Sequence, residues 1–128
     1  MFYDSPLDFT MKEGTNRTLV LYIREQDDLT GDITVVDVTG WTFYFDLRVS
    51  RTASTSYITK DSTDTAEIEI TAPTNGEIKI YLKWEDFSTS PRFNVPYYCE
   101  VFGVTPGGQR FDIGDGNPRF LRKVVQIP

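Results

Sequence analysis

Apolar and polar residues alternate with a period of two along most of the chain. The clearest case is residues 36–49, where a glycine turn leads into a run with an apolar residue at every odd position. The apolar residues of this run are Trp41, Phe43, Phe45, Leu47 and Val49. Alternation of this kind places them on one face of a sheet and Tyr44, Asp46 and Arg48 on the other. The pattern therefore predicts a strand with one buried face.

The same alternation recurs before and after this run. The predicted strands are residues 8–12, 18–24, 33–38, 41–49, 66–71, 77–84, 97–101, 111–113 and 120–127, with a short edge strand at 57–59. Between them, residues 25–32 are predicted as a loop and 86–92 as a helical turn or loop. Gly114, Gly116 and Pro118 are predicted to interrupt the strand pattern. No run has a 3.6-residue period long enough for a helix, so the chain is expected to be all-β, a two-sheet antiparallel sandwich of about seven to nine strands.

Two connections carry more specific expectations. Pro73 and Asn75-Gly76 predict a tight turn, so the strands on either side form a hairpin in which Glu67 and Glu69 face Lys79 and Lys83. Residues 50–65 are rich in serine and threonine and hold little apolar material to anchor them. We expect this connection to be mobile.

Length and charge limit the classes of function. The 128 residues suit a single domain covering 1–128, and its nine Phe and seven Tyr favour strands. The net charge of −6 argues against nucleic acid as a partner, because a phosphate backbone would be repelled. No apolar run reaches the length of a membrane span, and the first residues lack the features of a secretory leader. We expect a protein made and kept soluble in a reducing cytoplasm, with no membrane partner.

The residue types needed for common catalytic and zinc sites are scarce. The chain has no histidine and a single cysteine, Cys99, so an internal disulfide and a Cys/His zinc site are both excluded. A cysteine nucleophile would also need a base. Cys99 is therefore expected to fill the core beside Tyr97 and Val101 as a small apolar group.

Acidic residues raise the question of a calcium site. The candidate ligand groups are Asp27, Asp28 and Asp32; Asp112, Asp115 and Asn117; and Asp61 with Asp64. Clustered oxygens are what a hard cation requires, but none of these segments has the spacing of an established calcium loop. The favoured interpretation is that these are turn residues bonding nearby backbone amides. No metal or cofactor is predicted.

A pair of carboxylates could instead support glycoside hydrolysis. The candidates are Glu67, Glu69, Glu85 and Asp86. Such a site needs one carboxyl group in an apolar pocket, whereas these residues fall on polar strand faces or in loops. No enzymatic activity is expected.

Aromatic and basic residues supply the candidate interface. Tyr44, Tyr81, Tyr98 and Phe102 fall on strand faces opposite the predicted core. Arg110, Arg119, Arg122 and Lys123 form the basic part of the C-terminal region in an otherwise acidic chain. An aromatic stripe could bind a glycan or be covered by a protein neighbour, and the basic residues could be solvated or dock an acidic surface. Protein assembly is the favoured interpretation of both.

Four segments, taken in order, resemble a family of small virion proteins of tailed bacteriophages. They are D-F-T-M-K-E-G at 8–14, D-V-T-G-W-T-F-Y-F-D-L-R at 37–48, G-E-I-K-I-Y-L at 76–82 and Y-Y-C-E-V-F-G-V-T-P-G-G at 97–108. The chain departs from the family where an aspartate of the tyrosine-rich strand is replaced around Cys99-Glu100, and where the 50–65 connection is longer. The resemblance implies an immunoglobulin-like sandwich that serves as a structural part of the tail, baseplate or neck.

The resemblance also implies partners and location. We expect other virion structural proteins and further copies of the chain as partners, in a particle assembled in the bacterial cytoplasm. Two alternatives stay open: a module that binds host-surface carbohydrate, and a protein that decorates the capsid.

Overall fold

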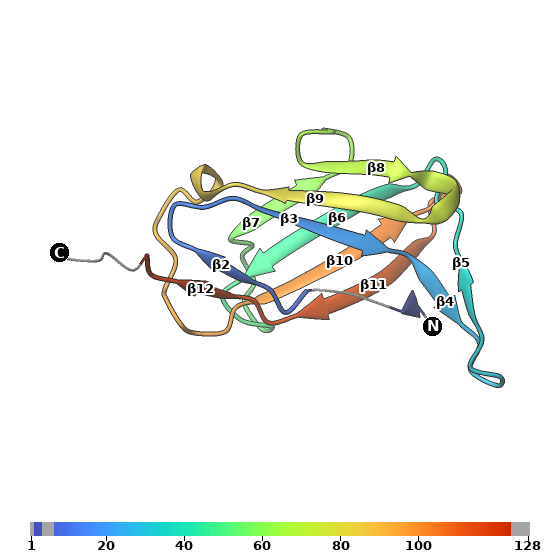
Figure 1. Cartoon of the computed structure of the whole chain (residues 1–128), viewed down its shortest axis with the longest axis horizontal. Coiled ribbons are helices and arrows are strands. Elements are labelled where there is room, and N and C mark those ends of the chain that lie inside the picture. The colour runs from blue at the N-terminus through green and yellow to red at the C-terminus, as the bar shows by residue number, and fades with distance from the viewer. Residues whose placement is uncertain (1, 4–6, 124–128) are drawn as a thin grey trace.

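Two antiparallel sheets make up most of the structure, a computed structural model that describes residues 2–3 and 7–123 (Figure 1). The four-stranded sheet has the order β11 (Arg110–Gly116), β10 (Tyr98–Val104), β6 (Thr42–Arg48) and β7 (Ile58–Asp61). The three-stranded sheet has the order β3 (Arg17–Tyr22), β9 (Glu77–Leu82) and β8 (Ile68–Ala72). The chain is all-β, as the alternation predicted, and its sheets are consistent with a β-sandwich.

Two small sheets and two short helices complete the described part. β12 (Arg119–Leu121) pairs with β2 (Thr10–Lys12), and β4 (Arg24–Gln26) lies between β1 (Phe2–Tyr3) and β5 (Ile33–Val35). The 3₁₀-helices are η1 (Pro73–Asn75) and η2 (Trp84–Asp86). The β12–β2 pair is parallel, so the expectation of purely antiparallel pairing is wrong at this point.

One hydrophobic core contains side chains from both main sheets. Strand β6 contributes Phe43, Phe45 and Leu47, all fully buried, as the alternation predicted. The other main contributors are Leu19, Leu21 and Ile23; Ile78, Ile80 and Leu82; Tyr97, Cys99 and Val101; and Leu7, Phe9, Met11 and Phe120. Each large apolar side chain buried here contributes roughly 1.5–3 kcal/mol.

Several positions differ from the sequence prediction. Val49 follows the end of β6 and is 41% exposed, and Asp46, predicted on the polar face, is only 8% exposed. Asp46 is buried because β6 lies inside its sheet, where Arg48 also covers it through an ion pair. Trp84 lies in η2 instead of continuing β9, and packs on the core from there.

Two segments that the sequence pattern predicted to be outside strands are part of strands. Gly114 and Gly116 both lie within β11. At Gly116 the backbone of Leu7 comes too close to the strand for a larger residue, whereas a Cβ atom at Gly114 would make an ordinary contact with the Leu7 side chain. Residues 24–26, partly within the predicted loop, form β4 and pair with β5 in a hairpin. The predicted final strand is limited to β12, and residues 124–127 lie outside the described residues, as do Met1 and residues 4–6.

The 50–65 connection is better anchored than its composition indicated. The predicted edge strand is present as β7, which pairs with β6, and its Ile58 is buried in the core. The ring of Tyr57 lies 5.6 Å from Phe87 and 5.8 Å from Tyr97. The expectation of little apolar anchoring is therefore wrong for this end of the connection, and its mobility stays a prediction.

The predicted hairpin around Asn75-Gly76 is confirmed. Gly76 has a φ of +67° at the end of η1, a left-handed conformation that favours glycine. Strands β8 and β9 then pair with Glu69 directly opposite Lys79, as predicted. Glu67 precedes β8 and Lys83 follows β9, so the predicted pairing of these two is wrong. Glu69 accepts its hydrogen bond from the hydroxyl of Tyr81, and Glu67 accepts one from the amide of Asp61.

Candidate protein interface

Three of the four predicted aromatic residues lie on the outer face of the four-stranded sheet. Tyr44 on β6 and Phe102 on β10 are directly opposite each other in the register, and their rings stack at 4.9 Å with an interplanar angle of 17°. The guanidinium of Arg110 lies 3.7 Å from the centre of the Phe102 ring. Phe102 is thus held between a tyrosine and an arginine, and Arg110 is held in turn by Asp112 at 3.1 Å.

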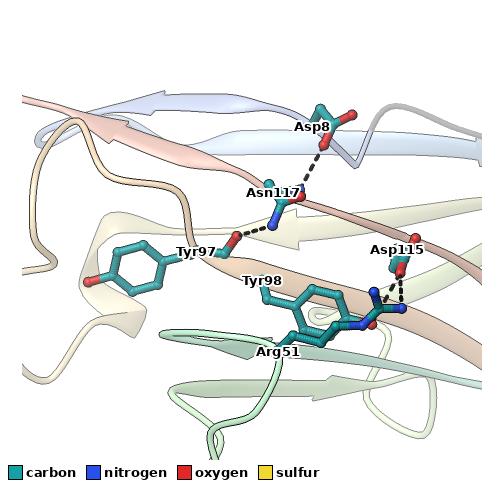
Figure 2. A network of polar contacts seen from close by, with 6 residues as sticks. All are labelled: Asp8, Arg51, Tyr97, Tyr98, Asp115 and Asn117. Atoms are coloured by element: carbon teal, nitrogen blue, oxygen red, sulfur yellow. Dashed lines mark hydrogen bonds and ion pairs between the residues drawn. The ribbon is translucent and has the colours of Figure 1, made fainter.

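Tyr98 forms a second aromatic and arginine pair on the same strand. The guanidinium of Arg51 lies 5.5 Å from the centre of its ring, and both side chains contact Asp115 (Figure 2). The Tyr98 hydroxyl donates a hydrogen bond of 3.3 Å to the Asp115 carboxylate. Burial, with the nearby charges of Glu100 and Asp115, raises the pKa of Tyr98. This tyrosine stays neutral at physiological pH.

A charged group lies between the two aromatic pairs. Glu100 on β10 is opposite Asp46 on β6, and Arg48 donates to Asp46 at 2.7 Å and to the carbonyl of Ala53 at 3.1 Å. Asp46, Arg48 and Glu100 line a depression of about 340 Å³, together with Tyr44 and Phe102. We call Tyr44, Tyr98, Phe102, Arg51, Arg110, Asp46 and Glu100 the aromatic face. Sequence analysis missed Arg51, since its place beside Tyr98 follows only from the path of the 50–57 connection.

Tyr81 lies apart from the other aromatic residues. It is on β9, on the outer side of the three-stranded sheet, and its hydroxyl donates a hydrogen bond of 2.6 Å to Glu69. This hydrogen bond raises the pKa of Tyr81. The structure therefore does not bring the four predicted aromatic residues into one stripe.

The predicted basic residues are also divided. Arg110 belongs to the aromatic face at the start of β11, whereas β12 lies beyond the other end of that strand (Figure 1). There Arg119 donates to the carbonyl of Asn94, and Arg122 lies 4.5 Å from the centre of the Phe93 ring. The Lys123 amide donates to Glu13. Arg119, Arg122 and Lys123 therefore lie on β12 or directly after it, apart from Arg110.

The acidic candidates bond to the protein itself. Asp27 accepts hydrogen bonds from the amides of Leu29 and Thr30, which lower its pKa. Asp61 accepts hydrogen bonds from the hydroxyl and the amide of Thr63. These bonds, mainly the one from the hydroxyl, lower the pKa of Asp61. Asp64 accepts from the amide of Ala66. Asn117 bonds Asp8 and the carbonyl of Tyr97 (Figure 2).

No metal-binding arrangement is found within residues 2–3 and 7–123: no three or more His, Cys, Asp or Glu side chains there are placed to hold an ion. Asp28 and Asp32 are exposed, and Glu85 is exposed beside Asp86 in η2. Asp86 forms an ion pair of 2.6 Å with Lys60, a lysine that is 7% exposed. Among the described residues, the candidate carboxylates are therefore either exposed or bonded to nearby groups of the fold, and they are not gathered into a shared site.

Comparison with known proteins gives no further guide. No family model matches the chain, and no curated protein matches it. In the part of the chain that the structure describes, no helix is long and apolar enough to cross a membrane.

Proposed function

We propose that this chain is a non-enzymatic structural component of a tailed-phage virion. In this role it acts in the tail, baseplate or neck as an assembly module with an immunoglobulin-like fold. Its partners are other virion proteins and further copies of itself.

The strand order supports the immunoglobulin-like part of the proposal. Such domains place strands B, E and D in one sheet and G, F, C and C′ in the other. The order β3-β9-β8 corresponds to B-E-D, and β11-β10-β6-β7 corresponds to G-F-C-C′. The position of Tyr97, two residues before Cys99 at the start of β10, also agrees, because its hydroxyl accepts a hydrogen bond of 2.8 Å from the upstream amide of Arg92.

The aromatic face is the observation that carries the assembly role. Tyrosine, phenylalanine and arginine are enriched in protein interfaces, and arginine stacked on an aromatic ring has already lost part of its conformational freedom. Tyr44, Phe102 and Arg110 supply this composition on the outer side of a sheet. Because the sheet holds these side chains in place, a partner could cover them at a small cost in entropy.

The same face argues against the carbohydrate-binding alternative. A sugar binds an aromatic ring by lying flat on it, but one side of Phe102 is stacked with Tyr44 and Arg110 lies over the ring at 3.7 Å. The Tyr98 ring is covered in part by Arg51. Capsid decoration uses the same kind of interface, so the position in the particle separates it from the favoured role.

Incorporation into phage particles tests the proposal. Particles lacking the gene would be complemented with the wild-type chain or with the double variant Phe102→Ser/Arg110→Glu, and purified virions analysed by mass spectrometry. We expect the wild-type chain in the virion and an amount of the double variant at least tenfold lower. Removing a buried ring or charge from an interface typically costs about 1–3 kcal/mol. The variant Val49→Ala, an exposed change outside the aromatic face, serves as the matched control.

A cryo-electron density map of the same virions would assign the chain to tail, baseplate, neck or capsid surface. Absence of the wild-type chain from purified virions would contradict the proposal. Binding of the free protein to host glycans, abolished by Phe102→Ser, would favour the carbohydrate-binding alternative in its place.

A further inference from the structure

The β4–β5 hairpin projects beyond one end of the two main sheets (Figure 1). Its turn is well defined: the Asp27 amide donates to the carbonyl of Asp32, and Asp27 accepts from Leu29 and Thr30. Leu29 lies at the tip of this turn and is 96% exposed. We call residues 24–35 the arm.

The arm combines apolar and acidic surface. Ile33 and Val35 on β5 are each about half exposed, so three large apolar side chains are in contact with water on one small hairpin. The arm is acidic: it has four carboxylates and one basic residue, Arg24. The carboxylates are Glu25, Asp27, Asp28 and Asp32. Arg24 is itself occupied, because its guanidinium donates to the carbonyls of Ile23 and Asn75.

A hollow of about 310 Å³ lies at the other end of the three-stranded sheet, where β3 begins and β9 ends. Leu82, Ala66 and the ring of Tyr81 give it an apolar lining, and Arg17 and Lys83 give it positive charge. Arg17 and Lys83 are both exposed. Within the described residues, neither forms an ion pair.

We propose that the arm of one copy docks in the hollow of a second copy, with Leu29 inserted against Leu82 and Tyr81. Asp28 and Asp32 then lie near Arg17 and Lys83. The charges of the two surfaces are opposite, and each has an apolar centre surrounded by charged groups, which is the usual arrangement of a protein interface. This inference rests on the proposed assembly role for its biological setting, and on the arm and the hollow for its chemistry.

The arm cannot reach the hollow of its own chain. Both are joined by β3, which separates Arg17 at its start from the arm after its end by roughly 20 Å at about 3.3 Å per residue. The arm also points away from the sheets (Figure 1). The contact is therefore between different surfaces of two copies, and repetition of such a contact gives a closed ring or an open filament.

Sedimentation velocity of the purified full-length chain at low salt tests this contact. We expect the mean sedimentation coefficient to rise with protein concentration and to fall again at high salt. Leu29→Ser, Asp28→Lys and Lys83→Glu are each expected to raise the dissociation constant at least about tenfold, a typical effect at an interface hot spot. Val49→Ala and Arg92→Glu, an exposed arginine outside the arm, the hollow and the candidate interface, are the matched controls for apolar and charged surface. Circular dichroism checks that every variant is folded.

The two charge variants also complement each other. Asp28→Lys has a basic arm tip and the normal basic hollow, whereas Lys83→Glu has the normal acidic arm and a less basic hollow. Mixed in equal amounts, each supplies the surface that the other lacks, so association is expected to return. Misfolding of either variant cannot produce that recovery.

Three results would overturn the inference: a wild-type chain that stays monomeric at all concentrations, association unaffected by Leu29→Ser, or association weakened by Arg92→Glu and not by Lys83→Glu. None of these results bears on whether the chain is present in purified virions. Failure of this contact is therefore distinguishable from failure of the proposed function.

Discussion

Burial determines the chemistry of the single cysteine. Cys99 has no exposed surface, and its thiol lies 3.5 Å from the carbonyl of Leu7, to which it donates. Burial is the main cause that raises the pKa of Cys99 to about 12. Because the thiolate is the reactive form, this cysteine is inert at neutral pH, in agreement with the core role predicted from the sequence.

The raised pKa of Cys99 predicts a loss of stability in alkali. A group whose pKa is raised by folding contributes fully below its unfolded pKa of 9.0, and that contribution is lost as the pH rises toward about 12. The free energy of unfolding should fall by up to about 1.4 kcal/mol per pH unit in this range. Urea unfolding at pH 8 to 11 would show a shallower decline for Cys99→Ala, and parallel profiles would contradict the prediction.

The ion pair between Lys60 and Asp86 is the most buried one in the described structure, and Asp86 also accepts the amide of Lys83 at 2.8 Å. Asp86→Ala should lower the free energy of unfolding by about 3 kcal/mol, because it leaves the Lys60 ammonium buried without a partner. The double variant Lys60→Met/Asp86→Ala should be more stable than Asp86→Ala alone. Urea unfolding measures the free energy of unfolding of both variants. A double variant no more stable than Asp86→Ala alone would contradict the prediction.

At the scale of elements, close backbone contact determines where β11 can run. Gly116 is opposite Cys99 on β10, and a Cβ atom at this glycine would lie 2.5 Å from the carbonyl carbon of Leu7. Real Cβ atoms do not approach backbone so closely. Glycine at position 116 permits the backbone at Leu7 to pass close to β11. The sequence pattern predicted that this glycine would interrupt the strand, but it lies within β11.

Gly116→Ala is therefore expected to destabilise the fold. Overpacking of this kind costs roughly 1–3 kcal/mol, and here the obstacle is backbone, which cannot easily move. Gly107→Ala, in the β10–β11 turn, is the matched control, since the nearest atom to its added Cβ is the Thr105 hydroxyl at 3.8 Å. Thermal unfolding of the two variants should show a clear drop for Gly116→Ala only; equal midpoints would contradict this reasoning.

For the whole molecule, local alternation was enough to predict the elements but not all of their partners. β6, β9 and β10 follow from period-two runs of their own residues, since a buried sheet face requires that pattern. The parallel pairing of β12 with β2 joins segments about a hundred residues apart, and no local pattern encodes it. The candidate site was predictable to a similar extent: Tyr44, Tyr98 and Phe102 were found from their strand face, but Arg51 and the separation of Arg110 from Arg122 depend on the three-dimensional path of the chain.

Three turn aspartates give the fold a common response to acid. Hydrogen bonds from Thr39, mainly from its hydroxyl, lower the pKa of Asp37, as comparable bonds do for Asp27 and Asp61. A pKa lowered by folding means that the carboxylate form stabilises the native state above the unfolded pKa, and that this contribution is lost as the pH falls through the folded value.

Stability should therefore be constant from neutral pH to about pH 5 and decrease below about pH 4, where unfolded aspartates begin to take up protons. The variant Asp37→Asn separates this cause from general charge repulsion. It should be less stable than the wild type at pH 7, and thermal unfolding at pH 7, 5, 4, 3 and 2 should show the difference closing below pH 4. A constant difference across this range would mean that Asp37 acts through its shape alone, because an amide retains the carbonyl oxygen that accepts the Thr39 bonds but has no charge to lose.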